Sequence, residues 1–116
     1  MDIKQDLSFI IRKSLIQLRI NLYTIDLIFE NEIIISIANE VVYIEGENKI
    51  QIWDSVNNPK FSINNLLGIL VVNAIVDEQD NLIIEFRNNG ILIIKSAKDM
   101  HESYIINNGD DFQVIY

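Results

Sequence analysis

The residue best suited to catalysis in this 116-residue chain is its single histidine, His101, which is followed by Glu102 and Ser103. A Ser–His–acid triad would need this histidine as its general base. The sequence lacks the glycine-flanked serine turn that exposes the nucleophile in hydrolases of that kind. We therefore expect His101 to be solvated at the edge of a strand, and we expect the protein not to be an enzyme.

Two acidic turns are the next candidates for chemistry. Residues 77–81 (DEQDN) and 107–111 (NNGDD) each place several carboxylate and amide oxygens in one short segment. Calcium binds such oxygens, but neither segment has the EF-hand spacing or its bidentate glutamate. The absence of cysteine and the single histidine argue against a zinc site. No metal and no cofactor are predicted, and a small-ligand or metal-binding β-module is kept as the alternative function.

The charge balance favours a protein partner. Lys and Arg number 9 and Asp and Glu number 17, which gives a net charge of −8. Proteins that bind nucleic acids neutralise phosphates with basic residues, so that class is excluded. Residues 1–20 hold four bases and two acids, a net +2, whereas the other 96 residues hold five bases and 15 acids, a net −10. Many of these acids fall in predicted turns, where they could form a negative rim that attracts a basic protein. Solubility alone would explain the same charge.

The predicted partner-binding residues combine the acids of these turns with two aromatic side chains as anchors, because Trp and Tyr dominate interface energetics. Packing at the edge of the core is the alternative for both aromatic side chains. They are Glu40, Glu45, Glu47, Trp53, Asp54, Asp77, Glu78, Asp80, Asp99, Glu102, Tyr104, Asp110 and Asp111.

The composition predicts a β-rich fold. Isoleucine is abundant, whereas glycine and proline number 4 and 1. Branched side chains suit a pleated sheet. Short links between the apolar runs require antiparallel pairing. We expect an α+β, β-rich domain with a largely antiparallel curved sheet, either a half-barrel or a sandwich, of about eight to nine strands with one or two short helices.

We expect one domain, residues 1–116, that contains four segments. Residues 1–14 are the N-terminal helix (2–14), 15–53 a first hairpin unit, 54–69 a loop and short helix (about 60–67), and 70–116 a second hairpin unit. A strand begins at Leu15, with Ile16, Leu18, Ile20 and Leu22 on its apolar face, and continues to Phe29. The later strands are predicted at 33–37, 41–45, 49–53, 70–76, 82–87, 91–95, 102–106 and 111–116.

Two features of this pattern concern turns and repeats. Asn89-Gly90 and Asn108-Gly109 predict type I′ hairpin turns, because both residue types tolerate a positive φ. The segment from Leu15 to Phe29 and its isoleucine-rich return strand are similar to the segment from Leu66 to Phe86 and its return strand. Duplication of one unit would explain this similarity, and so would the general likeness of isoleucine-rich hairpins.

Several motifs resemble those of small bacterial proteins. The first is Leu66-Leu67-Gly68, followed by an acidic turn, a strand that ends in Phe86, and Asn89-Gly90. The second, Tyr23 through Asn31, is similar to the first hairpin of that family. The third is His101-Glu102-Ser103-Tyr104, where the family has Tyr-Glu-Ala-Trp. The resemblance covers roughly residues 15–116. Glu32 in place of glycine, the longer turn at 87–90 and Tyr104 in place of tryptophan depart from the pattern.

This family resembles the immunity proteins of bacterial polymorphic-toxin and contact-dependent growth-inhibition systems. The resemblance implies an immunity protein that binds the C-terminal domain of its cognate toxin, expected to be a basic nuclease, and neutralises it by stoichiometric occlusion through an acidic surface. We also expect a monomer when unbound, because a net charge far from zero keeps small domains monomeric. The longest uncharged stretch, 61–76, is shorter than a membrane span, and the N-terminus is unlike a secretory signal. We therefore expect a cytoplasmic protein that contacts neither membrane nor nucleic acid.

Overall fold

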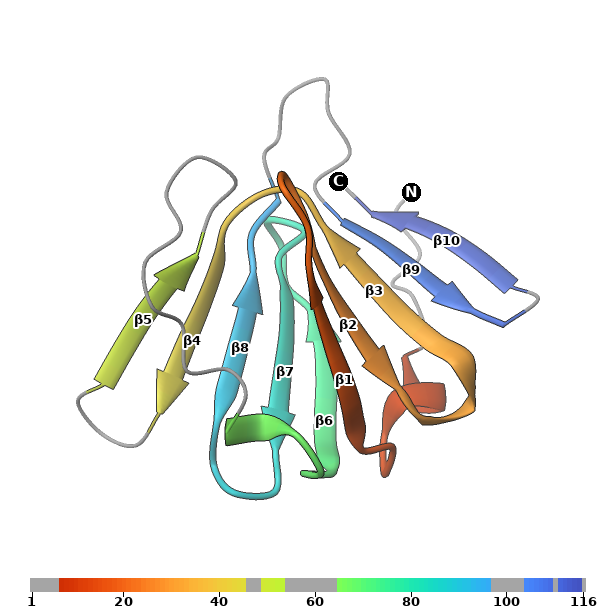
Figure 1. Ribbon diagram of the computed structural model, residues 1–116, viewed down its shortest axis with the longest axis horizontal. Helices are drawn as coiled ribbons and strands as arrows, with labels where there is room; N and C mark the ends of the chain where they lie inside the picture. The colour runs from red at the N-terminus through yellow and green to blue at the C-terminus, as the bar shows by residue number, and fades with distance from the viewer. Residues whose placement is uncertain (1–6, 46–48, 54–64, 97–103, 110, 116) are drawn as a thin grey trace.

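The computed structural model describes residues 7–45, 49–53, 65–96, 104–109 and 111–115, with the backbone alone for 49–53 and 111–115. These residues form ten strands in two five-stranded antiparallel sheets, with no helix longer than a 3-10 turn (Figure 1). The predicted fold class, a β-rich and largely antiparallel sandwich, is therefore confirmed. One strand more than the predicted eight to nine is present, because the first predicted strand is a hairpin.

Both sheets have the same plan of a three-stranded meander and an added hairpin. The first sheet contains β1 (Leu15–Ile20), β2 (Ile25–Phe29), β3 (Ile33–Ile37), β9 (Tyr104–Asn108) and β10 (Asp111–Ile115), in that order. The second contains β6 (Val71–Val76), β7 (Leu82–Phe86), β8 (Ile91–Ile94), β4 (Val41–Glu45) and β5 (Lys49–Trp53), in that order. Each half of the chain thus builds one meander and gives its hairpin to the meander of the other half.

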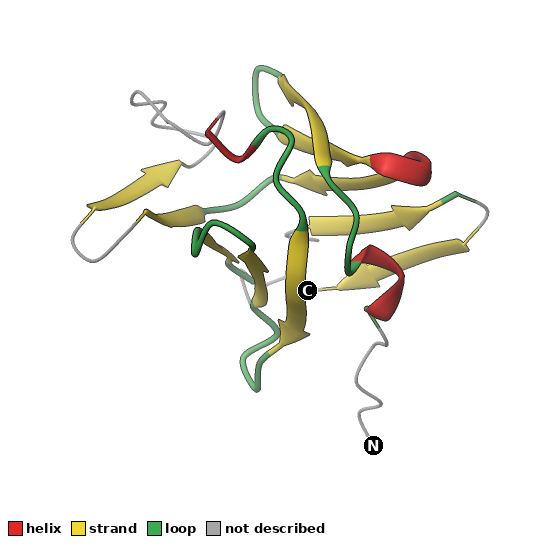
Figure 2. Cartoon of the chain, turned by 90° about the horizontal axis from the view of Figure 1, so that it is seen from below, coloured by secondary structure: helices red, strands yellow, loops and turns green. Residues whose placement is uncertain are grey.

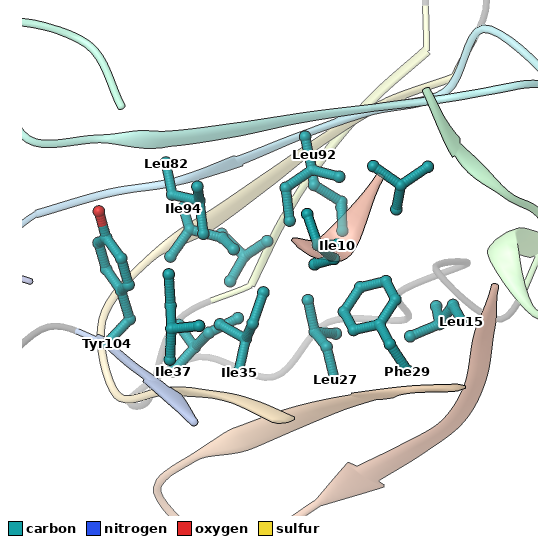
Figure 3. Close-up of a cluster of buried hydrophobic side chains, with 14 of the residues drawn as sticks. Ile10, Leu15, Leu27, Phe29, Ile35, Ile37, Leu82, Leu92, Ile94 and Tyr104 are labelled. Atoms are coloured by element: carbon teal, nitrogen blue, oxygen red, sulfur yellow. The ribbon is translucent and has the colours of Figure 1, made fainter. Parts of the chain in front are cut away.

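The core lies between the two sheets (Figure 3). In β3, the alternation of the strand buries Ile33, Ile35 and Ile37 and turns the residues between them outward. Leu82, Leu92 and Ile94 come from the opposite sheet and meet side chains such as Leu27 and Phe29. Among the side chains that the structure describes, the largest buried ones are Tyr43, Tyr104, Phe29 and Phe86.

Reciprocal hydrogen bonds join the two halves where their meanders begin. The Arg12 N–H donates to the Val71 carbonyl (2.8 Å), and the Gly68 N–H donates to the Leu15 carbonyl (2.7 Å). Ser14 and Leu70 pair with each other between these bonds. Leu15 and Val71 therefore occupy equivalent positions around an approximate two-fold axis, and a β-bulge follows each of them.

The repeat noticed in the sequence is thus present in the structure, but the predicted alignment was wrong. Leu66 is equivalent to Ile10 and not to Leu15, since both Leu66 and Ile10 are buried at the end of a 3-10 turn two residues before a left-handed residue. That residue is Arg12 (φ 71°) in the first half and Gly68 (φ 82°) in the second.

The two predicted helices are replaced by short turns in the described residues. Of residues 2–14, those from 7 onward contain only the 3-10 turn η1 (Ser8–Ile10). Of residues 60–67, the described ones are a 3-10 turn at 65–66 and Leu67, which pairs with Leu15. Left-handed backbone at Arg12 and Gly68 ends each turn and directs the chain into the bonds between the halves.

The strand predicted from Leu15 to Phe29 is the hairpin β1–β2. Of its predicted apolar face, only Leu18 packs against the core. Leu15 is fully buried, whereas Ile16 is 56% exposed. The β-bulge between Leu15 and Gln17 shifts the register of β1 against β2. Ile20, at the end of this edge strand, and Leu22, in the turn that follows it, are exposed as well.

Both Asn-Gly segments lie at hairpins, but in neither do Asn and Gly form the two central residues of the turn, as was predicted. After β7, Asn89 alone is left-handed (φ 71°), and its N–H donates to the Phe86 carbonyl across Arg87 and Asn88. Such a three-residue loop is the next most common hairpin connection. After β9, Asn108 pairs with Asp111 as part of the strand, and Gly109 (φ 62°) is the first loop residue.

Candidate functional site

Four connections meet at one end of the sandwich, which we name the upper end because it is uppermost in Figure 1. It consists of residues 21–24 between β1 and β2, 38–40 between β3 and β4, 77–81 between β6 and β7, and 95–96 after β8. The strand register places them together, because cross-strand neighbours form one row in each sheet. The rows are Ile20, Ile25, Ile37 and Tyr104 in the first sheet, and Val76, Leu82, Ile94 and Val41 in the second.

Hydrogen bonds connect these segments across the two sheets. The Tyr104 hydroxyl donates to the Asp80 carbonyl (2.8 Å), which links the first sheet to the 77–81 turn. The Lys95 N–H donates to the Glu40 carbonyl (2.9 Å). The Ser96 N–H donates to Asn81 Oδ1 (2.9 Å). These bonds join the connections 38–40, 77–81 and 95–96 to one another and to β9.

This end brings together four of the predicted partner-binding acids: Glu40, Asp77, Glu78 and Asp80. Glu78 and Asp80 are exposed, and Glu40 and Asp77 are partly buried. Among residues 21–24, 38–40, 77–81 and 95–96, Lys95 is the only base, so these segments carry a net charge of −3 (four acids and one base).

Asp77 organises the acidic turn. Its Oδ1 accepts the N–H groups of Gln79 and Asn81, both at 2.9 Å, and its Oδ2 accepts Asn81 Nδ2 at 3.2 Å. Partial desolvation acts to raise the pKa of Asp77, but these hydrogen bonds and the nearby Lys95 outweigh it and lower the pKa below its usual value. Asp77 therefore carries a fixed negative charge whose oxygens already accept protein donors, which leaves Glu78 and Asp80 to meet a partner.

Glu45 does not belong to this cluster, although the sequence placed it in the same rim. Since β4 runs away from the upper end, Glu45 lies at the opposite or lower end. Figure 2 shows the molecule from this end. There its Oε2 accepts the Tyr43 hydroxyl (3.1 Å) and Asn65 Nδ2 (2.8 Å). Burial, followed by the bond to Glu45, raises the pKa of Tyr43 to about 12.

Tyr104 was predicted as a partner anchor or as a residue that packs the core edge. Its side chain is buried in the core, so the anchor prediction is wrong. The alternation of β9 turns it inward beside Ile37, with only its hydroxyl directed to Asp80. Burial raises its pKa above the ordinary value, and the charges of Asp80 and Asp77 raise it further.

The remaining predicted site residues are placed in part or lie outside the described residues. The backbone of Trp53 pairs with Val41 at the upper end, and that of Asp111 pairs with Asn108 at the lower end. Glu47, Asp54, Asp99, Glu102 and Asp110 lie outside the described residues, as does His101.

An apolar turn at the upper end was missed by the sequence interpretation. Leu22 and Tyr23 form the tip of the β1–β2 hairpin and are among the most exposed large apolar side chains of the described residues. The prediction continued one strand through them and assigned Leu22 to the core. The signal that could have identified the turn is the pair Asn21 and Thr24, two residue types that favour turns, on either side of the tip.

A search of the described residues finds no group of three or more His, Cys, Asp or Glu side chains that could hold a metal ion. Nor does this part of the chain contain a helix long and apolar enough to cross a membrane. Comparisons with protein-family models, curated proteins and solved structures give no significant match.

Proposed function

We propose that this protein is an inhibitor of the immunity type, which binds a basic toxin domain through its upper end and blocks access of the toxin to its substrate. The observation that carries this proposal is the convergence of Glu40, Asp77, Glu78 and Asp80 from two separate connections. A nuclease must bind phosphates with basic residues, so a rigid cluster of carboxylates is complementary to its substrate cleft.

The rigidity of the cluster supports this function. The Asp77 carboxylate holds the 77–81 turn, and the Tyr104 hydroxyl attaches the same turn to the other sheet. A partner therefore meets charges that are already in place, which lowers the entropic cost of binding. The net charge of −8 attracts a basic partner at longer range and speeds its association. The sequence motifs that resemble immunity proteins agree with this role.

A small-ligand or calcium module has less support from the geometry. Side chains from both sheets meet in the core (Figure 3), where a ligand inside the curved sheets would have to lie, and both Asp77 oxygens accept amide donors. A calorimetric titration with calcium separates the two functions, because a site in the acidic turn would give a saturable signal.

The test of the proposal is calorimetric titration with the purified C-terminal domain of the toxin encoded directly upstream of this protein's gene. The titration is done at low and at physiological salt. We expect one-to-one nanomolar binding that weakens as salt rises. Glu78→Lys should weaken it about tenfold or more, since like charges would then meet. Glu32→Lys is the matched control, because Glu32 is also an exposed turn acid but lies at the lower end.

Tight binding without salt dependence, or an equal effect of the two variants, would contradict the acidic interface. The absence of binding by the unmodified protein would contradict the inhibitor function itself.

A further inference from the structure

We infer that the β1–β2 turn is the apolar anchor of the same interface, with Leu22 and Tyr23 entering an apolar pocket that basic residues of the partner protein surround. This inference rests on the proposed function and adds a second, chemically different contact to it. It assigns partner contact to residues that the acidic interface does not include.

The exposure of this turn is the first observation. Tyr23 is 67% exposed, Leu22 is 75% exposed, and Ile20, which directly precedes the turn, is 61% exposed. The tips of hairpins ordinarily carry Gly, Asn, Asp or Pro, which can be exposed to water without a loss of hydrophobic burial. Single exposed apolar residues need no explanation, but a group of three at the tip of one hairpin is typical of an interaction site.

The second observation is that the turn is held in place. The Asn21 N–H donates to the Thr24 carbonyl (2.8 Å), and Asn21 Nδ2 lies 2.9 Å from Thr24 Oγ1. The same amide donates to Asp26 Oδ2 (3.2 Å), whose buried carboxylate also pairs with Arg19 (3.4 Å). A pinned turn loses little entropy on binding, and tyrosine supplies a large contact area with few rotatable bonds.

The third observation is where the turn lies. The connections 21–24 and 77–81 are equivalent in the two halves of the chain, and both lie at the upper end (Figure 1). The structural repeat therefore presents one apolar turn and one acidic turn on the same end of the molecule. This combination matches the usual protein interface, in which apolar anchors are accompanied by charged residues at the rim.

Charge complementarity identifies the occupant as a basic protein. An anionic membrane surface attracts basic segments and would repel the net −3 of the upper end. A second copy of this chain would bring the same acids against each other. A partner with basic residues around an apolar pocket satisfies both turns at once.

The experiment compares the double variant Leu22→Ser/Tyr23→Ser with Ile16→Thr in binding to the C-terminal domain encoded upstream. Ile16 is the control because it is also exposed on β1 but lies at the lower end of that strand. We expect the double variant to bind at least about 30-fold more weakly through faster dissociation, as anchor residues do, and Ile16→Thr to change binding less than about threefold. The slope of affinity against salt should stay unchanged in the double variant, whereas Glu78→Lys should change both that slope and the association rate.

Thermal unfolding of each variant shows whether the fold is retained. Tyr23→Phe should bind like the unmodified protein if the ring supplies the contact. Unchanged binding of the double variant, together with weaker binding of Glu78→Lys, would overturn the anchor and leave the acidic interface standing. The reverse pattern would support the anchor and refute the acidic interface, and no binding by the unmodified protein would overturn both.

Discussion

Replacing Gly90 with alanine tests how tightly the two halves of the core fit. A Cβ at this position would lie 2.9 Å from Leu66 Cδ2, 3.0 Å from Asn88 Oδ1 and 3.4 Å from Tyr43 Cε1. The backbone has little room to withdraw, because the Gly90 N–H donates to Asn88 Oδ1 (3.0 Å) and its carbonyl accepts the Phe86 N–H (2.8 Å). We expect overpacking to lower the free energy of unfolding by about 1–3 kcal/mol.

Gly68 gives a contrasting control. No atom lies within 4 Å of a Cβ placed there, but its φ is +82°. Gly68→Ala should therefore cost only the strain of a left-handed residue, about 1–2 kcal/mol. The two glycines are thus retained for different reasons, space at Gly90 and backbone conformation at Gly68.

Urea denaturation of both variants, alone and combined with Leu66→Val, separates these reasons. Leu66→Val removes the atom nearest to the new methyl group of Gly90→Ala. Gly90→Ala and Leu66→Val should therefore show a favourable interaction energy of at least about 0.5 kcal/mol when combined. The changes in the free energy of unfolding caused by Gly68→Ala and Leu66→Val should instead be additive. A cost below about 0.5 kcal/mol for Gly90→Ala, or the same cost in both backgrounds, would refute the steric argument.

Three further predictions concern single residues. Tyr104→Phe should lower the free energy of unfolding by about 1 kcal/mol, measured in urea, because the bond to the Asp80 carbonyl is lost; no loss would mean that water replaces the hydroxyl. Arg12→Gly should raise the melting temperature, since Arg12 has the φ (71°) that its equivalent adopts as glycine; a lower melting temperature would show that its side chain stabilises the fold. The pKa of Asp77 is lowered in the folded state, so its contribution is present above its ordinary value of 3.8 and is lost as the pH falls below it. Asp77→Asn should therefore be destabilised by about 1 kcal/mol at pH 7 and lose less stability than the unmodified protein between pH 5 and pH 3.

Strand positions could be read from the sequence because local patterns decide them. β3 alternates isoleucine on its buried face, and the predicted range 33–37 matches the observed one. β1 could not be read in the same way. A bulge after Leu15 shifts its register, and on this edge strand apolar residues stay exposed, so the apolar period no longer marks the core.

The candidate site was predictable only in its composition. The acids of residues 77–81 were evident as a charged turn, but whether Glu40 or Glu45 joins them depends on the direction of β4. Pairing between distant strands settles that direction, and a local pattern does not contain it. The burial of Tyr104 likewise follows from the inward phase of β9.

The exchange of hairpins between the two meanders has a consequence for how the protein is made. β3 pairs with β9, so it gains its second neighbouring strand only after β9 has been synthesised. In the same way, β4 can pair with β8 only after β8 has been synthesised. Contacts between such distant residues make folding slow. On the ribosome the apolar edge of β3 remains without its final partner until residues 104–108 have emerged. Newly made chains should therefore gain protection from proteolysis in a single late step, when β9 closes the first sheet.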